Sequence, residues 1–400
     1  MTRFDLKVRA LVCCGAIIRN LGNAVIATMR SVLWPRRRPL RAARVCVCRV
    51  GAIGDLVCTT PALDAIRRAY PEAHLTLLTT PGKYGGARHA TDLLGSAKWI
   101  DEIVVYEIDA IATIRRRFAF AMELRARKFD VWFDLPMDRA KFSRMVRDMI
   151  LARLLGARWA FGWRLEHVGF AAKAEAEVKE CPDEVERLAR VLGRCGIEDA
   201  TRFPPLVDPA QNDFMGSILR DFEQSRRALI AVAPGARRRC NLWPSERFAR
   251  VCENLAASGA VVFLIGSADD SAMCEQIAAH ARGYAKNLAG KLSLMQSCAL
   301  LRRCDVLLCV DSGPQHLAAA VGTRCVALFS QRNQRRRWYP HGSHHIVLEG
   351  TVECHTCLLD ACPYDNRCMK QISVDAVLAA THAILRQRSR RAEIAIAASQ

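Results

Sequence analysis

Acidic residues are scarce in this 400-residue chain. It has 40 Asp and Glu against 59 Lys and Arg, which gives a formal net charge of +19 at pH 7. Such a charge predicts anionic partners: nucleic acid, an anionic membrane surface or phosphorylated substrates. The chain also lacks zinc-finger, RNP-type and double-stranded-RNA-binding signatures, and its basic stretches lack interleaved aromatic residues. We therefore expect no nucleic acid among its partners.

Long uninterrupted hydrophobic runs are also missing. Residues 11–34 are largely apolar, but Arg19 and Arg30 interrupt them and a basic run, 36–38, follows. No run reaches the roughly 18 to 20 residues that a spanning helix needs. A clear signal-peptide core and a small-residue cleavage site are absent as well. Residues 1–40 are therefore predicted to be a basic amphipathic extension that lies on anionic lipid, with a poorly ordered extension as the alternative.

Cysteine is plentiful, but its placement argues against disulfides. Many of the 18 cysteines lie inside apolar runs such as Val45–Cys48, where they are expected to act as small buried hydrophobic residues. A reducing cytoplasm fits this usage better than secretion. The exception is a Cys-x2-Cys-x4-Cys-x5-Cys array of four thiols that could bind a structural zinc ion: Cys354, Cys357, Cys362 and Cys368. Free thiols in a loop are the alternative, and no catalytic metal is indicated.

Strand-like and helix-like segments alternate along most of the chain. This alternation predicts an α/β fold of parallel strands with helices on both faces, and the length predicts at least two domains. The proline-rich stretch from Phe203 to Pro209 interrupts the rhythm, which then restarts. The predicted parts are the extension 1–40, a first domain 41–205, a linker 206–225, a second domain 226–385 and a basic tail 386–400.

The loop after the first predicted strand lacks both common nucleotide-binding fingerprints. Its sequence, Gly51-Ala52-Ile53-Gly54-Asp55, has neither the G-x-G-x-x-G spacing nor a P-loop lysine. Gly51 and Gly54 permit a tight turn and close approach of a ligand. Asp55 falls in the first turn of the next predicted helix, where the helix dipole keeps a carboxylate ionised. It could act as a general base; by spacing alone, a helix cap is the commoner role.

The segment Asp311–His316 follows a second predicted buried strand. A helix start there would present N–H groups and a positive dipole end to phosphate. We expect a diphosphate to bind here, at Asp311, Ser312, Gly313, Pro314 and His316. For His316, a half-buried structural role is the alternative.

Two more predicted strand ends carry charge. Arg237, Arg238 and Arg239 follow Pro234-Gly235, and their guanidinium groups could bind phosphate or form a solvated charge run. Asp269 and Asp270 follow the strand that ends at Gly266. They could accept hydrogen bonds from a ribose, although capping a helix is the more usual role for either alone.

These motifs together resemble those of the ADP-heptose:lipopolysaccharide heptosyltransferases, glycosyltransferase family 9. The resemblance runs from about residue 44 to 385, and its carriers are Arg49–Asp55 with Thr60–Leu63, Pro234-Gly235 with Trp243-Pro244, and Asp311–Ala318. It implies a GT-B fold, in which two Rossmann-like parallel-sheet domains face each other across a cleft, with acceptor on the first and donor on the second.

The resemblance also implies a function. Family members transfer a sugar with inversion, here heptose from ADP-heptose, onto lipopolysaccharide core or a related phosphorylated glycolipid. They work at the inner face of the cytoplasmic membrane and need no catalytic cofactor. Asp55 matches the family's proposed base, and the segment that contains Asp311, Ser312, Gly313 and His316 matches its diphosphate-binding segment.

Asn241 departs from the family pattern. Many members carry a lysine two residues before the Trp-Pro pair, where it contacts donor phosphate; here Asn241 holds that position. One of the arginines 237–239 supplies the missing charge, or the donor is bound differently. The alternatives are therefore another nucleotide-sugar enzyme, such as a hexosyltransferase or an epimerase, and a non-enzymatic basic protein that binds membrane or nucleic acid.

Overall fold

The chain divides into two compact units, Met1–Pro204 and Pro205–Gln400. The structure is a computed structural model, and it describes the chain except residues 1–2, 81–88, 96, 108, 110–111, 167–173, 175–180, 226 and 398–400. The predicted linker 206–225 is largely helical, because α8 spans Pro209–Gln224 and packs against α11 (Leu294–Arg303) of unit 2. Proline suits the first position of a helix, so Pro209 starts α8 and does not break the chain into a linker.

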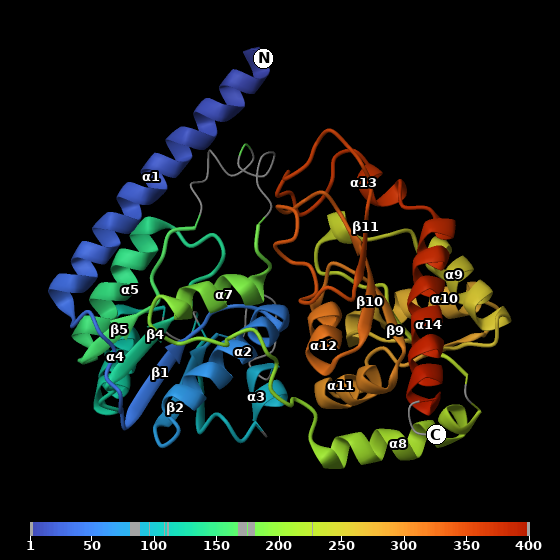
Figure 1. Cartoon of the computed structure of the whole chain (residues 1–400), viewed down its shortest axis with the longest axis horizontal. Helices are drawn as coiled ribbons and strands as arrows, with labels where there is room; N and C mark the ends of the chain where they lie inside the picture. Colours follow the sequence, from blue (N-terminus) through green and yellow to red (C-terminus); the bar gives the residue numbers. More distant parts are fainter. Residues whose placement is uncertain are drawn as a thin grey trace. The chain divides into compact units, whose positions relative to one another are not determined.

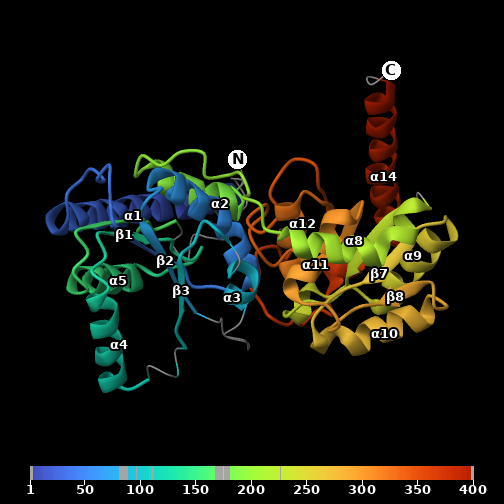
Figure 2. The same cartoon turned by 90° about the horizontal axis from the view of Figure 1, so that it is seen from below.

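Unit 1 is built on a sheet of parallel strands in the order β3-β2-β1-β4-β5 (Figure 1). The strands are β1 (Arg44–Cys48), β2 (His74–Thr79), β3 (Glu102–Val105), β4 (Val131–Asp134) and β5 (Trp159–Phe161). Helices α1 (Arg3–Leu33), α4 (Ile114–Ala126) and α5 (Phe142–Leu154) lie on one side of the sheet, and α2 (Ile53–Ala69), α3 (His89–Leu94) and α7 (Glu184–Gly193) lie on the other (Figures 1 and 2).

Unit 2 repeats this architecture with strand order β11-β10-β9-β6-β7-β8. Its strands are β6 (Leu229–Ala233), β7 (Val261–Leu264), β8 (Ala285–Asn287), β9 (Val306–Val310), β10 (Arg324–Phe329) and β11 (Ile346–Glu349). Its helical elements besides α8 and α11 are η1 (Arg239–Asn241), α9 (Ser245–Ala257), η2 (Ala268–Asp270), α10 (Ser271–His280), α12 (Gly313–Val321), α13 (Arg367–Lys370) and α14 (Val374–Ala397). The predicted basic tail from residue 386 thus continues α14 as far as Ala397.

Both sheets reverse their strand order at one place. In unit 1 the chain winds outward from β1 through β2 and β3, then returns to place β4 on the other side of β1; in unit 2 β6 and β9 are related in the same way. Cys48 pairs with Asp134 and Ala233 with Cys309 at the carboxyl ends of these strand pairs. Ligands of doubly wound sheets bind at such switch points. The fold therefore selects the loops that follow β1, β4, β6 and β9.

The strand cysteines behave as small apolar residues, as the sequence predicts. Cys46, Cys309 and Cys325 are fully buried, and the cysteines are free thiols. Burial raises the pKa of the Cys46 thiol well above its ordinary value, which keeps it neutral. These side chains fill space in the cores of the two units.

The N-terminal segment is one helix, α1. Contrary to our expectation, its stretch Ala10–Leu33 is long and apolar enough to cross a membrane by length and composition, with a mean hydropathy of 1.6. The prediction required an apolar run without charged residues. The mean hydropathy of Ala10–Leu33 stays high although the stretch includes Arg19 and Arg30. The second half of α1 is also part of unit 1, because Ile26 and the following Trp34 are buried in its core.

Candidate functional site

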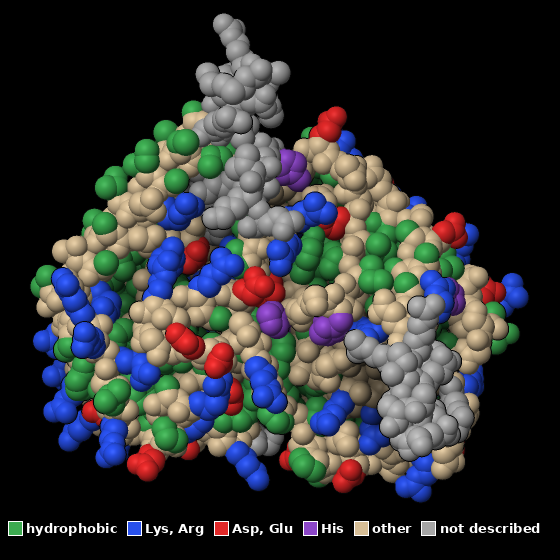
Figure 3. Space-filling view, in the orientation of Figure 1, with side chains coloured by type: hydrophobic (Ala, Val, Ile, Leu, Met, Phe, Trp, Pro, Cys, Tyr) green, Lys and Arg blue, Asp and Glu red, His purple; other side chains and the backbone are tan. Residues whose placement is uncertain are grey.

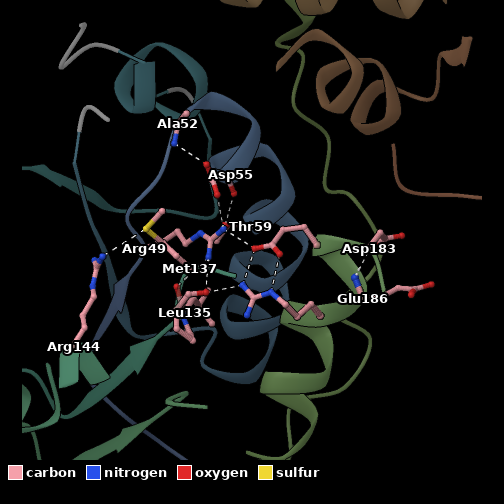
Figure 4. Close-up of polar contacts among 12 residues, drawn as sticks. Arg49, Ala52, Asp55, Thr59, Leu135, Met137, Arg144, Asp183 and Glu186 are labelled. Atoms are coloured by element: carbon pink, nitrogen blue, oxygen red, sulfur yellow. Dashed lines mark hydrogen bonds and ion pairs between the residues drawn. The ribbon is translucent and has the colours of Figure 1, made fainter. Parts of the chain in front are cut away.

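Asp55 lies in the first turn of α2, directly after β1 (Figure 4). One carboxylate oxygen, Oδ2, accepts a hydrogen bond from the backbone N–H of Ala52 at 2.9 Å, which caps the helix. The other, Oδ1, lies 3.0 Å from the guanidinium of Arg49. The side chain keeps 17% of its surface exposed. A carboxylate accepts about four hydrogen bonds, so these two leave acceptor capacity for a substrate hydroxyl.

Arg49 joins this carboxylate to a buried charge cluster. Its Nη2 contacts Asp55 and, at 2.7 Å, Glu184 of α7, while Nη1 donates to the carbonyl oxygens of Leu135 and Pro136. Both Arg49 and Glu184 have fully buried side chains. Arg49 therefore fixes the Asp55 carboxylate to the end of β4 as well as to α7.

Arg187 completes the cluster. It donates two hydrogen bonds of 2.7 Å to Glu184 and one of 2.6 Å to the Pro136 carbonyl. Arg49 and Arg187 balance Asp55 and Glu184, so the buried group carries no net charge. Burial of ions is tolerated only with such pairing and additional hydrogen bonds.

The electrostatics of Asp55 are a balance of opposing effects. Burial raises its pKa above the ordinary aspartate value, the charge of Arg49 lowers it, and Glu184 raises it further. Burial would also raise the pKa of Glu184, but Arg187 and Arg49 hold it below the ordinary value. Arg187 and Arg49 thus favour the ionised form of Glu184, and the charge of Glu184 opposes ionisation of Asp55.

Gly51 makes room for the Asp55 side chain. A Cβ atom at residue 51 would lie 2.3 Å from the Asp55 Cβ and 2.5 Å from its Cγ. The expected reason for this glycine was close approach of a ligand. The closest approach in the structure is that of Asp55 itself.

Asp134 is the second carboxylate at the unit 1 switch point, and our sequence reasoning did not select it. It ends β4 beside Cys48 and is 7% exposed. Burial raises its pKa to about 7, Asp148 adds to the rise, and Arg144 opposes it. Its position at the end of an apolar strand was the available signal. Glu184 and Arg187 were missed too, and they are far from Asp55 in sequence.

In unit 2, Asp311 follows β9 and is held by amide donors. Asn241 donates to its backbone carbonyl at 3.0 Å and to Oδ2 at 3.1 Å, Gln315 donates to Oδ1, and Asn333 donates to Oδ2. Burial raises the pKa of Asp311 to about 6, while Arg332 and these donors oppose the rise. Asp311 therefore fixes the conformation of the loop before α12 through its hydrogen bonds to Asn241, Gln315 and Asn333.

Asn241 is an interior residue, which changes the meaning of its departure from the family pattern. It is 3% exposed, its amide nitrogen is given to Asp311, and its oxygen accepts from the Ser330 hydroxyl at 2.5 Å. The resemblance to the family implies that the side chain at this position contacts donor phosphate. In the structure it instead ties η1 to the ends of β9 and β10.

Helix α12 begins where predicted, with Ser312 as its N-cap. Pro314 has no N–H, and the Gln315 N–H lies 3.4 Å from the Ser312 carbonyl oxygen, so Gly313 provides the donor of the first turn. The Ser312 hydroxyl donates to Val310 at 3.3 Å. His316 is 5% exposed, with its ring edge-on to Trp338. The helix start thus offers fewer phosphate donors than the sequence suggested.

The arginine loop after β6 is partly neutralised. Arg238 forms an ion pair with Asp360, which also lies 3.1 Å from Arg332, whereas Arg237 and Arg239 are exposed. Arg238 was predicted to bind phosphate together with Arg237. A phosphate would have to compete with Asp360 for it.

Asp270 has the capping role that its position favoured. It accepts hydrogen bonds from the backbone N–H and the hydroxyl of Ser267 at 2.8 and 2.7 Å. The carboxylate also fills the space beside Gly235 and Gly266, where added Cβ atoms would meet it at 2.1 and 2.8 Å. The Asp270 carboxylate therefore fills the space between the loops that follow β6 and β7.

The cysteine array gains no support as a metal site from the arrangement of its side chains. Among the residues that the structure describes, no three His, Cys, Asp or Glu side chains are grouped so as to hold a metal ion. Cys354, Cys357 and Cys362 are half-buried and Cys368 is buried. Zinc at this array stays a prediction, which metal analysis of the purified protein would test.

A comparison with known protein families decides the class of the protein. The sequence profile of glycosyltransferase family 9 (heptosyltransferase) matches residues 117–367, more than half of the chain. The chain belongs to glycosyltransferase family 9. It is therefore a glycosyltransferase, which sets aside the non-enzymatic alternative. The matched segment contains Asp311 and the arginine loop, while Asp55 precedes it.

Curated family 9 relatives are heptosyltransferases. The chain is 32% identical over 170 residues to lipooligosaccharide heptosyltransferase 2 of Haemophilus influenzae, a match that covers 38% of this chain and 48% of that protein. It is 26% identical over 291 residues to lipopolysaccharide heptosyltransferase 3 of Escherichia coli K12, covering 69% and 79%. The chain thus spans about half the length of the first relative and most of the second.

Solved family 9 structures share the fold. A glycosyltransferase of family 9 from Veillonella parvula superposes with a TM-score of 0.70 at 20% identity, covering 88% of this chain and 99% of that one. The ADP-heptose lipopolysaccharide heptosyltransferase II of E. coli superposes with a TM-score of 0.61 at 21% identity, covering 87% and 99%. The fold of this family 9 chain is therefore GT-B, as expected.

Proposed function

We propose that the chain is an inverting heptosyltransferase that moves heptose from ADP-heptose onto lipopolysaccharide core or a related phosphorylated glycolipid. The observation that carries the proposal is the geometry of Asp55: an ion-paired carboxylate at a sheet switch point, oriented by Ala52 and Arg49 and still partly exposed. Membership of family 9 supplies the reaction class, and the names of the relatives supply the sugar.

Asp55 would act as the general base. It takes the proton of an acceptor hydroxyl, whose oxygen then forms a bond to the anomeric carbon of the donor. The bond from that carbon to the diphosphate oxygen breaks, and the nucleoside diphosphate leaves with the electron pair. Because the attack displaces the leaving group directly, the configuration inverts. Fixed donors stabilise charge that develops in the transition state, and the backbone N–H of Gly313 at the start of α12 supplies one.

The test uses the full chain with nucleotide sugars and truncated lipopolysaccharide acceptors, and mass spectrometry detects the transferred sugar. Asp55→Asn should lower kcat by about 100- to 10,000-fold, as removal of a general base does, while donor affinity measured by calorimetry is unchanged. The matched control is Asp64→Asn, on the same helix and paired with Arg68. Near-normal turnover by Asp55→Asn would remove Asp55 from the mechanism.

A hexose donor is the second candidate, because Asn241 departs from the family pattern at a position that contacts donor phosphate. The side chain at the position of the family lysine is buried and engaged with Asp311, so it supplies no positive charge to the donor. A panel of ADP-, UDP- and GDP-sugars separates the candidates. Transfer from a hexose donor alone would replace heptose in the proposal and leave the role of Asp55 intact.

We further propose that the enzyme is cytoplasmic and peripheral at the inner face of the cytoplasmic membrane. The net charge of +19 favours an anionic surface and a phosphorylated acceptor. Membrane recovery of the protein from lysed cells, compared at low and high salt, tests this location.

A further inference from the structure

Helix α1 is inverted relative to an ordinary surface helix. Surface helices of soluble proteins turn an apolar stripe inward and charged residues outward. From Ala10 to Leu33, the exposed positions of α1 include Leu11, Ile17, Ile18, Leu21, Val25 and Val32. Asn20 and Thr28 are the only exposed side chains in this stretch with an oxygen or nitrogen atom, while Arg19 and Arg30 are half-buried. Figure 3 shows the hydrophobic side chains along the outer edge of α1.

The second half of this helix is fixed to unit 1. Asn23 exchanges two hydrogen bonds of 2.9 Å with the backbone of Leu165. Arg30 donates to the Ala160 carbonyl at 3.0 Å, and the Trp34 indole donates to Ala157 at 2.9 Å. The outer face is therefore held in a defined direction and is not the side of a loose tail.

This attachment argues against a spanning role for α1. The apolar stretch that precedes these attachments, Ala10–Leu21, is about 18 Å of helix at 1.5 Å per residue, whereas the hydrocarbon core is about 30 Å thick. The residues before Ala10 include Arg3, Asp5, Lys7 and Arg9, which are costly in hydrocarbon. The geometry fits a helix that lies in the plane of the interface.

The charge around this face is mainly positive, and the one acidic side chain of the neighbouring helix α5, Asp148, is paired with Arg147. No Asp or Glu occurs between Asp5 and Asp55, and the exposed Arg36 and Arg37 directly follow the helix. The neighbouring helix α5 adds an exposed apolar patch, Ile150, Leu151 and Leu154, together with the exposed Arg147. Apolar side chains flanked by arginines complement a bilayer with anionic headgroups.

We infer that the outer face of α1 inserts into the anionic leaflet of a bilayer, in plane, and that Arg36 and Arg37 bind its headgroups. The inference deepens the proposed membrane location by naming the surface and the depth of contact. It does not depend on which sugar is transferred, because vesicle binding requires neither donor nor acceptor. A failure here would therefore leave the transferase proposal untouched.

The test is flotation of the full chain with vesicles of phosphatidylglycerol and phosphatidylcholine. The double variant Ile17→Glu/Ile18→Glu should bind at least about 10-fold more weakly, since it places charge in the apolar face. Arg36→Ser/Arg37→Ser should lose affinity for anionic vesicles at low salt only. The matched control is Ile218→Glu, an equally exposed isoleucine of α8 in unit 2, which should bind like the unaltered protein.

Two native thiols report the depth of insertion. Cys13 and Cys14 are exposed on the outer face, so vesicles should protect them from a water-soluble maleimide, as read by peptide mass spectrometry. Equal binding by the Ile17→Glu/Ile18→Glu variant, or labelling unchanged by vesicles, would overturn the inference. A dimer in light scattering that the same variant dissociates would assign the face to a second copy. Protection of an N-terminal tag from added protease would show that α1 spans.

Discussion

The two carboxylate oxygens of Asp55 have different partners, the backbone and a buried arginine. Oδ2 holds the N–H of Ala52, and Oδ1 holds Arg49. Capping and proton transfer were alternatives in the sequence, but the structure allows both, since each oxygen has acceptor capacity left. The base that we propose is thus oriented on both sides before any substrate binds.

Glu184 should tune this base from a distance. Its charge raises the pKa of Asp55, so Glu184→Gln should move the acidic limb of the pH profile of kcat/KM to lower pH. Because Arg49 loses a partner, kcat should fall about 10- to 100-fold, as misplaced catalytic groups cause. Arg49→Gln should move the limb to higher pH, since Arg49 lowers that pKa. Glu186→Gln, on the same helix, is the control; two shifts of the same sign would refute this coupling.

Asp134 should make stability depend on pH. Its folded pKa of about 7 is above the ordinary value of 3.8, so its contribution to stability is fully present only below the ordinary pKa, decreases as pH rises from there, and is lost above 7. Asp134→Asn should therefore stabilise the fold by about 1 to 3 kcal/mol more at pH 8 than at pH 5. Thermal unfolding at both pH values measures this. A pH-independent difference, like that expected for the exposed Asp213→Asn, would contradict it.

For single residues, the sequence identified candidate site residues only where a reactive side chain directly follows a predicted strand. Asp55 and Asp311 could be selected because each follows an apolar strand. Arg187 and Glu184 could not, because their partner Arg49 is 135 positions from Glu184 in the chain. From the sequence, Asn241 shows only that the positive charge of the family lysine is missing. The structure adds the two hydrogen bonds that Asn241 donates to Asp311.

The element that carries Asp55 depends on one missing Cβ atom. Gly51→Ala would place a methyl group 2.3 Å from the Asp55 Cβ, which forces the carboxylate or the loop to move. We expect a loss of about 100-fold in kcat, the effect of a shift of about 1 Å. Gly193→Ala is the control, because a Cβ there meets nothing within 4 Å. Kinetics and far-UV circular dichroism of both variants separate a displaced base from a disrupted helix.

Elements were predicted well where burial and periodicity agree. Strands β1, β6 and β9 form where the sequence predicts them. Each is almost entirely apolar, as expected of parallel strands, which are buried on both faces of the sheet. Helix α8 was missed because Pro209 indicated a break, although proline also starts helices. The apolar length of helix α1 was underestimated. Many of its apolar side chains face outward, so they do not follow the spacing expected of a helix that packs one apolar side on a core.

Each unit of the molecule has its own sheet and its own buried core. We therefore expect a fragment of residues 205–397 to fold cooperatively and to bind ADP without catalysing transfer, because Asp55 lies in the other unit. Calorimetry with ADP and thermal unfolding test this. A fragment that folds but binds no nucleotide would move the donor site away from the start of α12.

The attachment of α1 has a consequence for how substrates meet. Asn23, Arg30 and Trp34 join the helix to unit 1, the unit of Asp55, so its outer face and the base move as one body. An enzyme and a lipid-linked acceptor held in one thin layer encounter each other by lateral diffusion, at a high effective concentration. If α1 binds the bilayer as we propose, the rate should follow the surface density of acceptor in the vesicle, and diluting the vesicles in buffer should leave it unchanged.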